Sequence, residues 1–168
     1  MTISAERPSR PSPALLRQPA CALALGFGAG LAPRAPGTVG SLLGVLLALA
    51  LVALPTAVAG VVLVGLSAVG VWCCGVAGRR LGVSDHPAIV WDEVVGMALT
   101  LLAVPPAWPH YLAGFVLFRA FDILKPWPVG VLDRHVGGGL GVMLDDLAAG
   151  LLAGLSLQML MLAAARVG

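Results

Sequence analysis

The stretch that decides the fold class is residues 142–165, VMLDDLAAGLLAGLSLQMLMLAAA, in which Asp145 and Asp146 begin an otherwise apolar run. The run is long enough for a membrane helix, because a spanning helix needs about 20 apolar residues. Ionisable side chains are costly inside a membrane, and where they occur they mark functional sites by default. The sequence therefore predicts a membrane helix that carries a functional pair of carboxylates at its start.

The composition of the whole chain is that of an integral membrane protein. Hydrophobic residues make up 59% of the 168 residues and charged residues 11%, and the mean hydropathy is +0.98. Soluble domains contain about 25% charged residues. Residues 35–78 carry no charge, which is enough for two spans with a turn at Pro55. The net charge of +2 is scattered, without the basic cluster and interleaved aromatics typical of nucleic-acid binding, so that class is set aside.

The alternation of apolar and polar segments predicts an all-α, polytopic membrane helical bundle of about five membrane segments, some of them short. Residues 1–19 form a polar, Pro-rich tail that we expect to be disordered. Residues 20–168 are expected to form a single helical membrane domain, in which residues 78–93 and 118–139 are polar connectors. The expected spans cover roughly residues 39–54, 57–77, 94–104, 108–118 and 142–165.

The basic residues predict how the bundle is oriented, because basic residues are retained on the cytoplasmic side of a membrane. They fall before the first apolar hairpin, directly after it, and after the second hairpin. Both polar connectors are therefore expected to face the cytoplasm. The three groups are Arg7, Arg10, Arg17 and Arg34; Arg79 and Arg80; and Arg119, Lys125 and Arg134.

Two pairs of carboxylates start two different predicted helices, and both pairs lie on the connector side of the bundle. Like charges brought together repel unless a cation neutralises them, and carboxylate oxygens suit Mg²⁺ or Mn²⁺. The pattern therefore predicts a metal site. Its candidate ligands are Asp92, Glu93, Asp145 and Asp146.

Small residues follow each acidic pair by about one helical turn. Gly96 follows the first pair, and Gly150 follows the second and forms a small-xxx-small pair with Gly154. Residues of this kind let membrane helices approach closely. They would allow the two helices to share an ion, although packing alone is the alternative explanation.

Groups suited to an anion lie in the connectors and before the first span. Arg119, Asp122 and Lys125 are spaced i, i+3 and i+6, on one face of a helix that Pro126 would end. Before the first span, APGTVGS offers backbone N–H groups and two hydroxyls at a helix N-terminus. The candidate phosphate-binding residues are Thr38, Ser41, Arg119, Lys125 and Arg134.

Three sequence blocks closely resemble the bacterial phosphatidylglycerophosphatase A family: GFGAGLAPRAPGTVGSL, DHPAIVWDEVVGM and FRAFDILKPWPVGVLDRHVGGGLGVMLDDLAAG. The resemblance covers about residues 22–155, with the blocks in matching order. It implies an all-helical phosphatase of the bacterial inner membrane that removes the terminal phosphate of phosphatidylglycerophosphate, with Mg²⁺, in phospholipid biosynthesis. The acidic motifs of the family fall on Asp92, Glu93, Asp122, Asp145 and Asp146.

The individual roles are inferred from position. Mg²⁺ is expected to be held by Glu93, Asp145 and Asp146, with Asp92 either as a further ligand or as a residue that supports the ligands without touching the ion. Arg119 and Lys125 would neutralise the phosphate oxygens. Asp122 would position or deprotonate the attacking water, and a phosphoaspartate on Asp122 stays open as the alternative.

Two other functions compete with the phosphatase. A CDP-alcohol phosphatidyltransferase is also a membrane enzyme with Mg²⁺ and clustered aspartates, but its signature DG-x₂-AR-x₈-G-x₃-D-x₃-D is absent. A cation or proton transporter would also place carboxylates in the membrane, but spread toward its middle. Beyond the lipid substrate and the surrounding membrane, the sequence indicates no obligate protein partner.

Overall fold

A computed structural model describes residues 11–167, and every regular element in this range is helical. The all-α prediction is confirmed. Two short 3-10 helices precede and follow the first α-helix, and six further α-helices complete the chain. The elements are η1 (Pro13–Arg17), α1 (Pro19–Ala24), η2 (Gly26–Leu31), α2 (Pro36–Leu51), α3 (Thr56–Leu81), α4 (Trp91–Leu101), α5 (Trp108–Leu124), α6 (Val129–His135) and α7 (Gly138–Val167).

The expected disordered tail is only partly testable, because residues 1–10 lie outside the described residues. Residues 13–17 form η1 instead, and the Ser12 hydroxyl accepts a hydrogen bond from the backbone N–H of Ala14 (3.3 Å). Leu15 and Leu16 pack against the hydrophobic core. This apolar contact favours an ordered segment, which the Pro-rich composition did not indicate.

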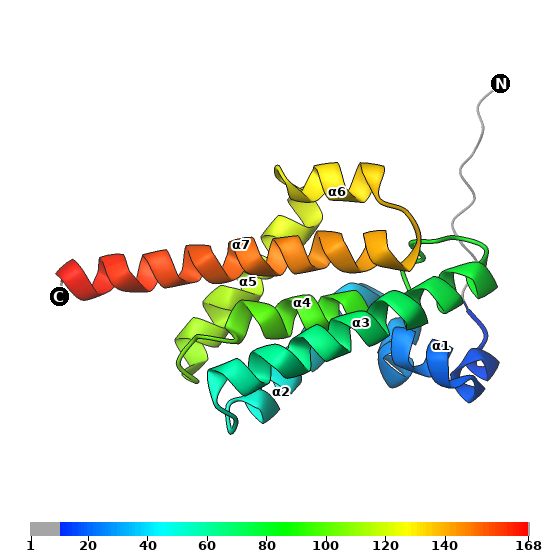
Figure 1. Cartoon of the computed structure of the whole chain (residues 1–168), viewed down its shortest axis with the longest axis horizontal. Helices are drawn as coiled ribbons and strands as arrows, with labels where there is room; N and C mark the ends of the chain where they lie inside the picture. The colour runs from blue at the N-terminus through cyan, green and yellow to red at the C-terminus, as the bar shows by residue number, and fades with distance from the viewer. Residues whose placement is uncertain (1–10, 168) are drawn as a thin grey trace.

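Helix α4 is the central element of the bundle, although it is short. Nine of its eleven residues are buried. It lies between α2 on one side and α7 on the other, and α3 and α5 also pack against it (Figure 1). Both carboxylates at its start are therefore carried into the interior by a helix that is covered on most sides.

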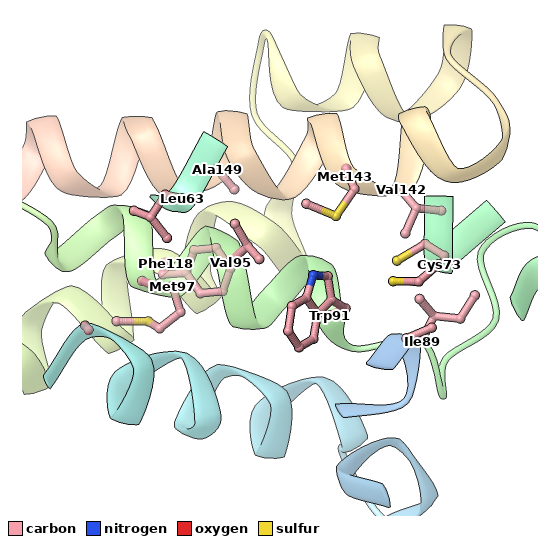
Figure 2. Close-up of a cluster of buried hydrophobic side chains, with 14 of the residues drawn as sticks. Leu63, Cys73, Ile89, Trp91, Val95, Met97, Phe118, Val142, Met143 and Ala149 are labelled. Atoms are coloured by element: carbon pink, nitrogen blue, oxygen red, sulfur yellow. The ribbon is translucent and has the colours of Figure 1, made fainter. Parts of the chain in front are cut away.

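The core around α4 is built from large apolar side chains. Figure 2 shows Trp91, Val95 and Met97 of α4 with Phe118 of α5 and Met143 of α7 in this cluster. The one polar group of Trp91 is satisfied, since its indole N–H donates to the backbone oxygen of Leu66 (3.2 Å). This packing fixes the start of α4 relative to the two helices that cross it.

Helices α4 and α7 approach closely where glycines face each other, as expected from the small residues. A Cβ added at Gly96 would lie 2.7 Å from the backbone oxygen of Asp146, and one at Gly150 would collide with the backbone oxygen of Gly96. The Thr100 hydroxyl also bonds the oxygens of Gly96 (3.0 Å) and Gly150 (3.2 Å). The crossing thus brings Asp146 of α7 to the start of α4.

Within the described residues, two helices are long and apolar enough to cross a membrane, rather than the expected five. They are α3 and α7, and only 28% of the apolar window of each is buried. Helix α2 has 16 residues, α5 has 17 and α4 has 11, so each is shorter than the typical span of about 20 residues. Helix α4 in particular buries most of its surface inside the protein.

The polar connectors gather at one end of the bundle. The connections α3–α4 and α6–α7 lie at this end, and the turns α2–α3 and α4–α5 lie at the opposite end (Figure 1). Helices α3 and α7 run the length between the two ends. The arrangement places the acidic starts of α4 and α7 on the connector side.

Candidate active site

Three carboxylates from two helices converge at the centre of the candidate site. One oxygen from each of Asp92, Glu93 and Asp146 can be chosen so that all three lie within 4.8 Å of one another. Asp92 is 6% and Asp146 3% exposed, and Glu93 is partly buried. The glycine crossing of α4 and α7 is what brings them together.

Each of these carboxylates has an oxygen without a partner. Among the described residues, Asp92 Oδ1, Glu93 Oε2 and Asp146 Oδ2 are buried and accept no hydrogen bond. A buried, unpaired anionic oxygen is costly, and native structures rarely leave one unsatisfied. A hard cation would satisfy all three at once, since Mg²⁺ prefers carboxylate oxygen ligands. The donor set therefore fits such an ion.

The electrostatics at the start of α4 agree with this fit. Burial raises the pKa of Asp92 well above the usual carboxyl range, and the charge of Glu93 raises it further. Burial also raises the pKa of Glu93, and there the neighbouring charge is that of Asp146. The ionised cluster thus requires a compensating positive charge.

Asp145 lies outside this group of three, although the sequence places it among the metal ligands. Its Oδ2 accepts a hydrogen bond from Lys125 Nζ (2.7 Å), and its Oδ1 accepts one from the backbone N–H of Asp146 (3.1 Å). Successive residues of a helix point about 100° apart. Asp145 and Asp146 therefore cannot both face α4, and Asp145 faces Lys125 instead.

Lys125 joins two carboxylates and so links α6 to α7. It follows α5 in a left-handed conformation (φ 45°) and bonds Asp133 of α6 as well as Asp145. Burial alone would lower its pKa, but the hydrogen bonds to Asp133 and Asp145 outweigh burial and raise the pKa above its usual value. The ammonium group is therefore firmly charged, and its third N–H is left for an anion.

Arg119 lies between the cluster and the N-terminus of α2. Its Nη1 bonds Asp122 Oδ2 (2.5 Å) and the Ser41 hydroxyl (3.4 Å), and lies 3.8 Å from Glu93 Oε1. Its Nε is buried and has no acceptor among the described residues. Protein groups thus fix Nη1 of the guanidinium, whereas its buried Nε–H has no protein partner among the described residues.

The N-terminus of α2 packs against the side chains of Arg119 and Glu93. A Cβ added at Gly37 would collide with Glu93 Oε1 and lie 3.3 Å from Arg119 Nη1. The Ser41 side chain is fully buried and donates to the backbone oxygen of Gly37 (2.9 Å). Ser41 therefore holds Arg119 rather than facing outward, whereas Thr38 is partly buried and its hydroxyl makes no hydrogen bond within the described residues.

A polar pocket of about 370 Å³ opens beside Asp145, and the exposed Arg134 lines it. Arg134 is therefore next to the site but not part of the cluster. Sequence reasoning missed the pairing of Lys125 with Asp133, because the Pro126–Pro128 turn between them hides their proximity. The pocket is lined by Ser84, Asp85, Asp133, Arg134, His135, Val136, Gly137, Gly138, Gly141, Val142 and Asp145.

Comparison with known proteins gives consistent matches. The sequence model of the family described as Phosphatidylglycerophosphatase A matches residues 22–161. Two proteins named Phosphatidylglycerophosphatase A are similar to the chain. The one from Escherichia coli is 44% identical over 132 residues, which cover 78% of this chain and 77% of that protein. The one from Haemophilus influenzae is 42% identical over 140 residues, which cover 82% and 86%.

A third relative carries a different name. A Bacteroides thetaiotaomicron protein, provisionally named a phosphatidylinositol-3-phosphatase, is 42% identical over 135 residues, covering 74% of this chain and 82% of that protein. No solved structure matches the chain significantly.

Proposed function

The chain belongs to the phosphatidylglycerophosphatase A family and is a phosphatase, and we propose that it hydrolyses phosphatidylglycerophosphate to phosphatidylglycerol and phosphate with Mg²⁺, in phospholipid biosynthesis. Family membership supports a lipid phosphate as the substrate. The metal dependence and the place in biosynthesis are the proposed parts.

The observation that carries the proposal is the set of three unpartnered carboxylate oxygens beside Arg119. The oxygens of Asp92, Glu93 and Asp146 lie close enough together to suit a cation, and the guanidinium of Arg119, whose Nε–H has no protein acceptor among the described residues, lies beside them. A cation site and an anion site side by side suit a phosphate group that bridges them. A transporter has no need of this second, cationic half.

Asp92, Glu93 and Asp146 would hold the Mg²⁺ ion. Bound there, the ion would supply charge neutralisation and polarise a phosphoryl oxygen. This set contains three of the four expected ligands and leaves out Asp145. Asp145 acts on the other half of the site, by orienting Lys125.

Arg119 and Lys125 bind the phosphate oxygens in this proposal. Arg119 offers Nε–H, and Lys125 offers the N–H that Asp133 and Asp145 leave free. Both cations are held by carboxylates before substrate binds. Phosphoryl transfer depends mainly on positioning and charge neutralisation, so such preorganised donors lower its barrier.

Asp122 accepts a proton from the attacking water. Its Oδ2 is engaged by Arg119, and no described residue donates to its Oδ1. The water oxygen forms the new bond to phosphorus as the bond to the glycerol oxygen breaks, and that oxygen takes a proton from solvent. Direct attack by Asp122 to form a phosphoaspartate is the alternative, which radiolabel from the terminal phosphate of the substrate retained on acid-quenched enzyme would reveal.

The two long apolar helices and the family together support association with a membrane. The finer part of the proposal is a multi-pass protein of the bacterial inner membrane whose site faces the cytoplasm. The excess of basic residues at the connector end supports this orientation.

The direct test is phosphate release by purified protein in detergent micelles. Wild type should release phosphate from phosphatidylglycerophosphate, and chelation of divalent cations should abolish release until Mg²⁺ is restored. Phosphatidylinositol 3-phosphate, suggested by the third relative, serves as the competing substrate. Faster release from that lipid, or undiminished release in chelator, would contradict the proposal.

A further inference from the structure

An apolar groove runs along α7 on the side away from the carboxylate cluster. Its volume is about 490 Å³, and it is walled by α3, α4 and α7. Leu132 of α6 closes one end. The lining residues are Gly60, Leu63, Val64, Ser67, Leu99, Leu102, Leu132, Leu144, Leu147, Ala148 and Leu151.

The groove offers an occupant almost no polar partner. Ser67 is its one polar side chain, and the Ser67 hydroxyl donates to the backbone oxygen of Leu63 (2.7 Å). A polar or charged ligand would lose its hydration there without compensation. The chemistry of the lining selects a hydrocarbon.

The groove opens to the hydrocarbon of a membrane rather than to the protein interior. Two of its three walls are α3 and α7, the two helices long enough to cross a bilayer. Val64 and Leu151 on its rim are 71% and 55% exposed. An acyl chain can therefore enter from the side without leaving an apolar environment.

A smaller cavity extends the groove along α7. This cavity of about 140 Å³ shares Leu99, Leu102 and Leu151 with the groove and reaches Gln158. The distance from residue 144 to residue 158 is about 21 Å at 1.5 Å per residue. One leaflet contributes about half of a 30 Å hydrocarbon core. The combined groove is long enough to follow an acyl chain through one leaflet.

The groove, the polar pocket and the carboxylate cluster are formed in part by neighbouring residues of α7. Residues of a helix follow one another at about 100°, so Ala148 of the groove, Asp145 of the polar pocket and Asp146 of the cluster come in that order around the axis. Helix α6 repeats the pattern, since Leu132 lines the groove and Asp133 the pocket. Around α7, the apolar groove is thus followed by the polar pocket and then by the carboxylate cluster. This order matches the acyl tail, the headgroup and the terminal phosphate of the lipid.

From this order we infer that the groove between α3 and α7 binds one acyl chain of the lipid substrate while its headgroup crosses the polar pocket to the carboxylate cluster. The inference rests on the proposed lipid phosphatase function. A second copy of the chain and a nonspecific lipid are the competing occupants. The headgroup then reaches the cluster from one direction, which orients the terminal phosphate.

The first experiment fills the groove and measures chain-length dependence. No atom lies within 4 Å of a Cβ built at Gly60, so Gly60→Phe places its ring in the groove without a backbone clash. Val61→Phe adds a phenyl group at the next position, which is 72% exposed and does not line the groove. Dihexanoyl, dioctanoyl and dipalmitoyl phosphatidylglycerophosphate are compared in the same micelles.

In wild type and Val61→Phe, KM should fall as the acyl chains lengthen, because a longer chain makes more van der Waals contacts in the close-packed groove than in the liquid-like interior of a micelle. In Gly60→Phe this dependence should flatten, with KM for the longest substrate raised about tenfold and the shortest nearly unaffected. Ala148→Phe, which fills the groove from the α7 side, should flatten the chain-length dependence of KM in the same way. If both groove variants keep the wild-type dependence, the inference is overturned.

The second experiment needs no turnover. Phosphatidylglycerophosphate with a photoactivatable group on one acyl chain should label peptides of α3 and α7 in wild type and lose this labelling in Gly60→Phe. Labelling spread evenly over the exposed face of α5 would indicate a nonspecific lipid, and labelling of α3 and α7 that disappears as the protein concentration rises would indicate that a second copy covers the groove; either result overturns the inference. Concentrated labelling without phosphate release would instead count against the proposed function alone.

Discussion

Asp145 and Asp146 are adjacent in the chain, yet their side chains belong to different halves of the site. Asp146 faces the carboxylates of α4, and Asp145 faces Lys125. Sequence alone treats such a pair as equivalent, because residue type and position are nearly the same. The direction of each side chain from the helix is what separates the roles.

Because the two side chains lie in different halves of the site, we expect their substitutions to have different effects on activity. Asp146→Asn and Glu93→Gln each remove one anionic oxygen from the cation site, so the Mg²⁺ concentration for half-maximal activity should rise about tenfold or more. Asp145→Asn should leave that concentration nearly unchanged and raise KM for the lipid, because Lys125 loses an orienting partner. Phosphate release measured over a Mg²⁺ titration distinguishes them.

His110→Gln, at the opposite end of the bundle, is the control and should change neither quantity. An Asp145→Asn variant with the Mg²⁺ requirement of Asp146→Asn would return Asp145 to the metal ligands.

Arg119 carries the second prediction at this scale. Arg119→Lys keeps the charge but loses the planar group that contacts Asp122 and Ser41 and that, in our proposal, binds the phosphate. We expect kcat to fall about 10²-fold, as for the loss of one transition-state donor, with the Mg²⁺ requirement unchanged.

Ser41→Ala should lower kcat in the same direction but less, since it loosens Arg119 without removing it. Arg119 would be orienting the carboxylates instead of binding phosphate if Arg119→Lys shifted the Mg²⁺ requirement and kept kcat at saturating metal.

At the scale of the elements, the helices were largely predictable, because charge-free runs alternate with polar connectors. The expected spans 39–54 and 57–77 correspond to α2 and α3, and 108–118 is the first part of α5. Which helices cross a membrane was not predictable in the same way. Hydropathy treats a helix buried in protein and one facing lipid alike, and α4 is of the first kind.

The candidate site was predictable as a set of residues but not as an arrangement. Clustered carboxylates and nearby cations identify the participants from spacing alone. The turn that follows Lys125 and the separate helix α6 depend on tertiary packing, so the contact with Asp133 has no local signal.

The glycine crossing of α4 and α7 gives a prediction for these elements. Gly150→Ala would place a methyl group against the backbone of Gly96, so the helices must separate. We expect a loss of about 1–3 kcal/mol in stability, as for overpacked cores, and a large loss of activity, because Asp146 moves away from Asp92. Thermal unfolding in detergent and phosphate release measure the two effects.

Gly65→Ala on α3 is the matched control, since nothing lies within 4 Å of its added Cβ. Gly150→Ala with wild-type stability and activity would show that the close crossing is not needed to assemble the site.

At the scale of the whole molecule, the bundle has two unlike ends. One end carries the acidic cluster, both connectors, and basic residues of the last turn of α3 and of the segment from the end of α5 to α6, and the other end carries the turns α2–α3 and α4–α5 (Figure 1). Apolar helices α3 and α7 join the ends. A membrane crossed by these two helices would therefore separate the site from the turns.

The proposed orientation can be tested with single cysteines in a protein lacking the buried Cys21, Cys73 and Cys74. Basic residues are retained on the cytoplasmic side, so a cysteine replacing Ser84 in the α3–α4 connector should resist an impermeant thiol reagent in intact cells. One replacing Ala107 in the α4–α5 turn should react. Both should react after permeabilisation, which controls for burial of either thiol. The reverse pattern would place the site on the outer face, where a cytoplasmic lipid substrate could not reach it, and labelling of both in intact cells would contradict a membrane between the two ends.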